Sequence, residues 1–341
     1  MGENSKIEWC DHTASPWHGC EKVAAGCDNC YAAQLSLRNP GTLGIWGPDG
    51  VRVKSKSFAK NLRLWNSQAE KSGNRVTVFP SLCDPFEDRP ELVAWRNEMF
   101  AVSDECPWVT LLLLTKRPEN VRRMWPAAFP AGDETPQSMW CPVCQSARDR
   151  SVCVEAADNQ DGPETPESYE EPRSLYCGSC GSKGLPHRSN VWIGTSIATQ
   201  ADADRNISEL LKCRDLSPVL FVSAEPLLGP VDVPAGIDWV IVGGESGPGA
   251  RPMDPRWVRS LRDQCQAAGV PFFFKQWGEH SAECVDGTEV DLQSLLPNQS
   301  VAFGDGKTNH VRFTRVGRKA AGRELDGRTW DEFPLADVLA G

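Results

Sequence analysis

Six short apolar runs recur along the chain, and each is followed by polar or loop-forming residues. They cover residues 76–82, 109–115, 191–197, 219–223, 239–243 and 271–275. Most of them are nearly continuous rather than alternating, which is typical of strands buried on both faces of a parallel sheet. The pattern therefore predicts six strands of one sheet. A short additional strand at 6–9 would precede the first group of cysteines.

Three segments between these runs have the composition of helices. They cover residues 90–102, 201–213 and 255–268. The third has apolar residues near the i, i+3, i+4, i+7 spacing of a helix face, at Trp257, Val258, Leu261 and Cys265. Gly269 then marks its end. Alternating strands and helices predict βα units, in either a barrel or an open doubly wound sheet.

Polar residues follow the predicted strands closely. They are Asp84, Lys116, Arg117, Ser196, Ser223, Glu225, Glu245, Ser246, Lys275 and Gln276. The carboxyl ends of parallel strands lie on one face of the fold, where ligands bind. Any one of these residues could instead cap a helix or a turn, but six such ends together favour a ligand site.

Residues 131–190 interrupt the alternation, because they are rich in Pro, Glu, Asp and Ser and carry half of the formal net charge of −10. We predict an α/β domain formed by 1–130 and 191–278 and a cysteine-containing insertion at 131–190. Residues 279–341 are then a C-terminal extension that packs on the main domain.

The composition limits the location and the partners of the chain. No apolar run approaches the roughly 18 residues of a membrane helix, and the polar N-terminus has no signal-peptide pattern. We therefore expect a cytoplasmic protein with no membrane partner. The acidic balance argues against a tight, salt-driven nucleic-acid binder.

Fourteen cysteines are many for a cytoplasmic chain, where clustered cysteines more often bind metal than form disulfides. The first cluster is Cys20, Cys27 and Cys30, with the spacing Cys-x6-Cys-x2-Cys. Three thiolates can hold three irons of a [4Fe–4S] cluster and leave the fourth iron open, as in catalytic metal sites. Cys10 or His18 could occupy that position instead and give a closed electron-transfer or zinc site.

A second cluster lies in the insertion, where Cys141 and Cys144 form one Cys-x2-Cys pair and Cys177 and Cys180 form another. Four thiolates in this arrangement suit a structural Zn²⁺, and a small insertion gains stability from a metal. An auxiliary iron–sulfur cluster, or reduced cysteines without metal, are the alternatives.

Short motifs along nearly the whole chain outside the insertion carry a resemblance to known proteins. They are Ile7-Glu8-Trp9, Gly19-Cys20, Gly26-Cys27, Cys30-Tyr31-Ala32, Leu114-Thr115-Lys116-Arg117-Pro118, Trp192-Ile193-Gly194-Thr195-Ser196, Ser223-Ala224-Glu225-Pro226-Leu227, Gly243-Gly244-Glu245-Ser246-Gly247, Phe274-Lys275-Gln276-Trp277-Gly278 and Asp326-Gly327-Arg328-Thr329-Trp330. In these motifs the chain resembles the phage-associated three-cysteine-motif protein family, which is radical-SAM-like. Radical-SAM enzymes commonly space their cysteines Cys-x3-Cys-x2-Cys, so the first gap here is three residues longer.

The resemblance implies a partial TIM-barrel-like (βα) fold of radical-SAM type, with the small insertion resembling a zinc ribbon. It also implies a radical-SAM iron–sulfur enzyme that uses a [4Fe–4S] cluster, S-adenosyl-L-methionine (SAM) and an electron donor. One electron would cleave SAM into methionine and a 5′-deoxyadenosyl radical, which takes a hydrogen atom from the substrate. The phage association suggests a nucleotide or a nucleic-acid base as that substrate.

Gly243, Gly244 and Glu245 are comparable to the glycine–glycine–glutamate motif that contacts the SAM amino group in many radical-SAM enzymes. There the motif follows the second strand, whereas here it follows the fifth predicted strand, and an ordinary turn explains it equally well. The further candidates for binding SAM or substrate are Ser196, Ser223, Glu225 and Lys275. Trp9, Trp17 and Trp277 could stack on a base or simply pack in the core.

Two other functions are compatible with parts of the sequence. A non-catalytic metal-binding or nucleic-acid-binding module would hold stoichiometric metal without binding SAM. A nucleotide-binding hydrolase would need a phosphate-binding glycine loop or a nucleophile–base pair, and the sequence has no such motif. No catalytic side chain is predicted from the sequence.

Overall fold

The computed structural model describes residues 3–126, 187–286, 299–303 and 309–334, and four short strands between 138 and 177. Of residues 284–286, 299–303, 309–310 and those four strands it describes only the backbone. The main sheet has seven parallel strands in strictly sequential order. They are β1 (His12–Thr13), β4 (Val76–Phe79), β5 (Val109–Thr115), β10 (Val191–Ser196), β11 (Leu220–Ala224), β12 (Trp239–Gly243) and β13 (Phe272–Gln276).

The six strands predicted from apolar runs are all present in this sheet. The strand predicted at 6–9 is wrong, because these residues form a turn that the Cys10 amide closes by donating to the Ile7 carbonyl at 3.2 Å. The edge strand is β1 instead, and it pairs with β4 through His12 and Val78. The protein is therefore a mixed α/β structure whose parallel sheet curls into a half-barrel.

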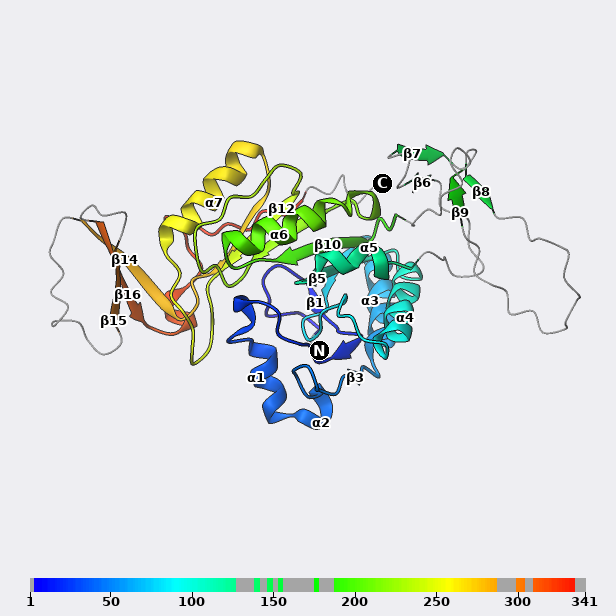
Figure 1. The fold of residues 1–341 in the computed structure, drawn as a ribbon, viewed down its shortest axis with the longest axis horizontal. Coiled ribbons are helices and arrows are strands. Elements are labelled where there is room, and N and C mark those ends of the chain that lie inside the picture. Colours follow the sequence, from blue (N-terminus) through cyan, green and yellow to red (C-terminus); the bar gives the residue numbers. More distant parts are fainter. Residues whose placement is uncertain are drawn as a thin grey trace, which may run out of the picture.

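Helices cover the outer face of this sheet, as Figure 1 shows. They are α3 (Phe58–Ser72), α4 (Leu92–Asp104), α5 (Val121–Met124), α6 (Gln200–Leu211) and α7 (Pro255–Ala268). The last has the predicted bounds, and Gly269 ends it in the left-handed conformation with φ 67°. Helix α3 was not among the predicted helices, although its buried residues Phe58, Leu62, Trp65 and Ala69 follow a helical spacing.

Two apolar cores lie on opposite sides of the sheet because successive side chains of a strand point to opposite faces. The outer core joins the helices to residues such as Leu113, Ile193 and Val240. The inner core fills the concave face, largely with aromatic rings: Trp9, Trp192, Phe221, Trp239 and Phe273. Trp239 meets Trp192 and Phe273 edge-on, with ring centroids 6.1 and 6.2 Å apart. This layer closes the half-barrel below its carboxyl edge.

The C-terminal residues first form a separate sheet and then return to the main one. The separate sheet is antiparallel, with the order β14 (His280–Asp286), β16 (Asn309–Arg315), β15 (Gln299–Phe303), and it lies at one end of the molecule (Figure 1). After α8 (Arg318–Ala321), Trp330 packs in the outer core. The Glu332 carbonyl accepts a hydrogen bond from Trp239 Nε1 at 2.9 Å.

Within the insertion the described backbone forms two antiparallel strand pairs. They are β6 (Ser138–Cys141) with β7 (Ser146–Asp149), and β8 (Cys153–Glu155) with β9 (Leu175–Cys177). The side chains of the predicted zinc ligands Cys141, Cys144, Cys177 and Cys180 lie outside the described residues, so the zinc site stays a prediction. In the described ranges, no helix has the length and apolar character needed to span a membrane.

Candidate metal and ligand site

Residues at or after the carboxyl ends of all seven strands of the main sheet line one cavity of about 470 Å³. The sequential strand order brings these carboxyl ends to a single edge. The predicted site residues in the lining are Ser196, Ser223, Glu225, Gly244, Glu245 and Lys275. Gly243 lies directly behind them, because a Cβ added to it would be 2.6 Å from Glu225 Oε1. The structure therefore brings the whole predicted set together.

The three predicted iron ligands line the same cavity. Cys20, Cys27 and Cys30 all belong to the segment between β1 and α1 (Tyr31–Arg38), and all three are free thiols. We call residues 20–30 of this segment the cysteine loop. A 3₁₀ turn, η1 (Ala25–Cys27), lies within it. Within the described residues, no three His, Cys, Asp or Glu side chains are already positioned together to hold a metal ion.

A fourth cysteine, Cys83, lines the cavity as well. Its backbone forms a parallel bridge with Gly19, directly before Cys20, and the Gly19 amide donates to the Leu82 carbonyl at 3.0 Å. Cys83 was not among the metal ligands predicted from the sequence. The signal for it was its position just after the strand at 76–79, at the same edge as the other polar strand ends.

The two residues that could have closed the metal site from the sequence are not in the cavity lining. Cys10 is buried in the inner core, and its thiol donates to Ser5 Oγ at 3.5 Å. His18 is buried, and its Nδ1 donates to the Thr42 carbonyl at 3.0 Å. Neither Cys10 nor His18 therefore lines the cavity of Cys20, Cys27 and Cys30, whereas Cys83 does.

Arg117 connects the cysteine loop to the ends of β4 and β5. Its guanidinium donates to Asp84 Oδ2 at 2.8 Å and to the Glu21 carbonyl at 2.9 Å, and it lies 3.8 Å from Cys20 Sγ. Asp84 also accepts from Thr115 Oγ1 at 2.6 Å, so the pair is fixed from two sides. Burial raises the pKa of the Cys20 thiol to about 12, with Asp84 adding to the effect and Arg117 opposing it. Metal binding at Cys20 therefore releases a proton at neutral pH.

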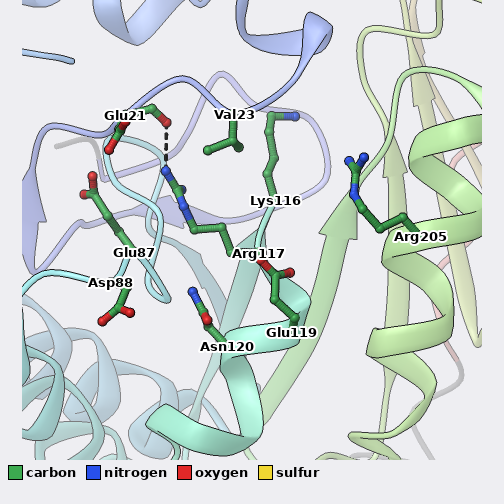
Figure 2. Close-up of a pocket in the computed structure, with 9 residues that line it drawn as sticks. All are labelled: Glu21, Val23, Glu87, Asp88, Lys116, Arg117, Glu119, Asn120 and Arg205. Carbon is green, nitrogen blue, oxygen red and sulfur yellow. Dashed lines mark hydrogen bonds between the residues drawn. The ribbon is translucent and has the colours of Figure 1, made fainter. Parts of the chain in front are cut away.

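A second, polar cavity of about 450 Å³ is also lined by Arg117, and Figure 2 shows the Arg117 guanidinium directed toward Glu21. Glu21, Val23, Lys116 and Arg117 line both cavities. Lys116 Nζ donates to Ser196 Oγ. The side chains of Lys116 and Arg117 thus contribute two positive charges to the lining of both cavities.

Glu245 holds the other end of the cysteine loop. Its carboxylate accepts from Asn29 Nδ2 at 3.0 Å and from Arg251 Nε at 2.8 Å. Arg251 also donates to the Ala25 carbonyl at 3.0 Å and to Asp28 Oδ2 at 3.2 Å. Burial acts to raise the pKa of Glu245, but the hydrogen bonds from Arg251 and Asn29 outweigh it and lower that pKa. Glu245, which was predicted to contact SAM, is therefore ionised and already hydrogen-bonded to Asn29 and Arg251.

Replacing Arg251 with leucine is expected to loosen the cysteine loop and to lower the free energy of unfolding by about 1–3 kcal/mol. The physical reason is that the mostly buried Glu245 carboxylate loses its cationic partner. Alkylation of Cys27 and Cys30, followed by mass spectrometry, should be faster than in the wild type. Lys212→Leu, which breaks the surface pair with Glu209, is the control. Equal alkylation rates in the two variants would show that Arg251 does not hold the cysteine loop in place.

Lys275 and Glu225 form an ion pair on the cavity wall, with Lys275 Nζ 2.8 Å from Glu225 Oε1. The other carboxylate oxygen accepts from Trp9 Nε1 at 3.2 Å and from Ser223 Oγ at 3.3 Å. Burial acts to lower the pKa of Lys275, but the charge of Glu225 and its hydrogen bond raise it overall. Glu225 therefore fixes a charged ammonium group at the cavity.

The two glycines of the predicted motif serve close contacts within the protein. Gly243 leaves room for Glu225, as described above, and a Cβ on Gly244 would be 2.0 Å from the Trp277 carbonyl oxygen. Of the three tryptophans considered for base stacking, Trp9 lines the cavity. Trp17 is fully buried outside the lining, and Trp277 donates its indole N–H to the Glu324 carbonyl at 2.8 Å.

The curled parallel sheet, with a cysteine-lined cavity at its carboxyl edge, defines a half-barrel protein whose cavity lies where βα folds usually bind ligands. The family model of DUF5131, described as a protein of unknown function, matches residues 4–334. The chain therefore belongs to the DUF5131 family. No curated protein matches the chain, and no solved structure matches it.

Proposed function

We propose that the protein is a radical-SAM enzyme that binds a [4Fe–4S] cluster through Cys20, Cys27 and Cys30. The observation that carries the proposal is that these free cysteines, which follow β1, line the same cavity as polar residues at the carboxyl ends of the other six strands. A metal site and a ligand site at one edge are what a cofactor bound next to a cluster requires. The radical-SAM type of the half-barrel belongs to the same proposal.

The residues present fit the cluster by their chemistry. Thiolates are the usual ligands of iron–sulfur clusters, and three of them come from one short loop that is fixed at both ends by Arg117 and Arg251. Because the three thiols are not yet gathered at one point in the described structure, cluster assembly has to draw them together. The cavity volume of about 470 Å³ lies within the range of small-molecule sites.

The chain's own residues would orient SAM and the substrate. Lys275 and Lys116 offer positive charge for a carboxylate or phosphate, and Ser196 and Ser223 offer hydroxyl groups. Trp9 belongs both to the buried inner core and to the cavity lining, so this apolar layer would exclude water on that side of the cavity. When bound, the cluster supplies the electron that cleaves SAM to the 5′-deoxyadenosyl radical. A nucleotide or nucleic-acid base as substrate, an external electron donor, zinc in the insertion and a cytoplasmic location complete the proposal.

The test is anaerobic reconstitution with iron and sulfide, reduction, and addition of SAM. The wild type is expected to release 5′-deoxyadenosine, and Cys27→Ala is expected to abolish it, because a loop with two thiols cannot hold a site-differentiated cluster. Cys213→Ala, which alters a buried thiol of the outer core, is the matched control and should retain the product.

If the reconstituted wild type releases no nucleoside, and if SAM does not change the EPR signal of its cluster, the enzyme proposal fails.

A second function, a non-catalytic metal-binding module, is favoured by one observation, the presence of Cys83 in the same cavity. Four thiolates would close the coordination of the cluster or hold zinc. This module would contain stoichiometric metal and would not bind SAM. Cys83→Ala distinguishes the two functions, because it would open a four-cysteine site but leave a three-cysteine site intact.

A further inference from the structure

We infer that Arg117 is a positioning residue that sets the reduction potential of the cluster by donating to the Cys20 sulfur. The inference rests on the proposed function, since it presupposes a cluster at Cys20. Arg117 contacts a predicted ligand rather than SAM or a substrate, so its expected effect is on the cluster's electron affinity rather than on SAM binding.

The contacts of Arg117 fit this role. One guanidinium nitrogen lies 3.8 Å from Cys20 Sγ and 2.8 Å from Asp84 Oδ2. The other terminal nitrogen donates to the Glu21 carbonyl at 2.9 Å, on the residue that follows Cys20. The planar guanidinium therefore fixes the position of the ligand's main chain and contacts its sulfur at the same time.

The surroundings of Arg117 restrict the movement of the guanidinium and limit its contact with water. Its side chain and that of Asp84 are both almost fully buried. Asp84 is held in turn by Thr115 Oγ1 and by the backbone amides of Phe86 and Lys116. A charge fixed in a poorly solvated position acts more strongly on its neighbours than the same charge in water.

The sign of the effect follows from the charge change on reduction. Adding one electron makes the cluster more negative, so a fixed positive charge and a hydrogen bond to a ligand sulfur stabilise the reduced form. Removing Arg117 should therefore lower the reduction potential. Lys116 is the neighbouring cation, but its ammonium is directed to Ser196, and no described contact joins it to a cysteine sulfur.

The experiment measures the midpoint potential of the reconstituted cluster by EPR-monitored titration with a low-potential one-electron reductant. Arg117→Gln is expected to disfavour the reduced form at least tenfold, which corresponds to about 59 mV for a one-electron couple. Arg123→Gln is the charge-matched control, because Arg123 pairs with the exposed Asp88 at the surface, and it should leave the potential at the wild-type value. Arg117→Lys keeps the charge and should fall between the wild type and Arg117→Gln.

A second variant covers the case in which Arg117→Gln loses its fold or its cluster because Asp84 is left unpaired. Asp84→Asn combined with Arg117→Gln removes both charges and still deletes the contact with Cys20. It is compared with Asp84→Asn alone, because loss of the Asp84 charge by itself raises the potential. A potential below that of the wild type for Arg117→Gln, or below that of Asp84→Asn for the double variant, supports the inference. An unchanged potential in either comparison, or loss of the cluster from both Arg117 variants, overturns it and leaves Arg117 with a structural role. Failure of the wild type to hold a cluster is a different result, which rejects the proposed function itself.

Discussion

Replacing Arg52 with leucine is expected to lower the free energy of unfolding by about 3–5 kcal/mol. Arg52 and Glu87 form an ion pair whose side chains are only 0% and 2% exposed. Arg52 Nε donates to Glu87 Oε2 at 2.9 Å, and a terminal nitrogen lies 2.5 Å from Oε1. Deleting the arginine leaves a buried carboxylate without its counter-charge.

The loss extends beyond the ion pair, because Arg52 also shapes the loop that forms part of the cavity rim. Its guanidinium donates to the carbonyl groups of Ile45, Gly47 and Gly50, each at 3.1 Å. Gly47 and Trp46 line the cavity. The variant should therefore weaken ligand binding as well as the fold, and urea unfolding gives the change in stability directly.

Arg63→Leu is the matched control, since Arg63 pairs with Glu105 at the surface with 53% and 47% exposure. Exposed pairs of this kind contribute about 0–1 kcal/mol. A double variant, Arg52→Leu with Glu87→Leu, should be less destabilised than the sum of the two single variants, because it leaves no unpaired charge. Equal losses for Arg52→Leu and Arg63→Leu would show that the buried pair is not important for stability.

Gly244→Ala is expected to destabilise the protein by about 3 kcal/mol and to reduce ligand binding in the cavity. The added Cβ would lie 2.0 Å from the Trp277 carbonyl oxygen and 2.5 Å from its carbon. These are backbone atoms, so no side chain can rotate to relieve the contact. The chain after β12 and the chain after β13 would have to separate, and the cavity residues Glu245 and Gln276 lie on or directly next to these two segments.

The control for this prediction is Gly229→Ala. A Cβ on Gly229 has no heavy atom within 4 Å among its described neighbours, and its φ is not in the left-handed region. Its thermal stability should stay close to that of the wild type. If Gly244→Ala unfolds at the same temperature as Gly229→Ala, the close approach of the two segments is not a constraint on the fold.

The strands were predictable because their apolar residues face a core on both sides of the sheet. Leu111 and Leu113 face the outer core while Leu112 faces the inner one, so the run at 109–115 reads as continuously apolar. Helix α3 was harder to recognise, because its polar residues outnumber the four that are buried. The strand expected at 6–9 has the right residue types, but local hydrogen bonds in a turn take its place.

The sequence by itself determined the α/β alternation, the six main strands, and the set of polar residues at their ends. It could do so because side-chain periodicity and the direction of parallel strands are local properties that recur in every βα unit. It also supplied the three cysteines of the loop, since their spacing is visible along the chain.

Only the tertiary structure decided what these residues contact. It joined Cys83 to the cysteine loop across more than fifty residues, and it excluded Cys10 and His18 from the cavity lining. It also engaged Glu245 with Arg251 and Asn29, and it placed Arg117 against Cys20. These are contacts between the ends of different strands, and they depend on how strongly the sheet curls, which no local pattern encodes.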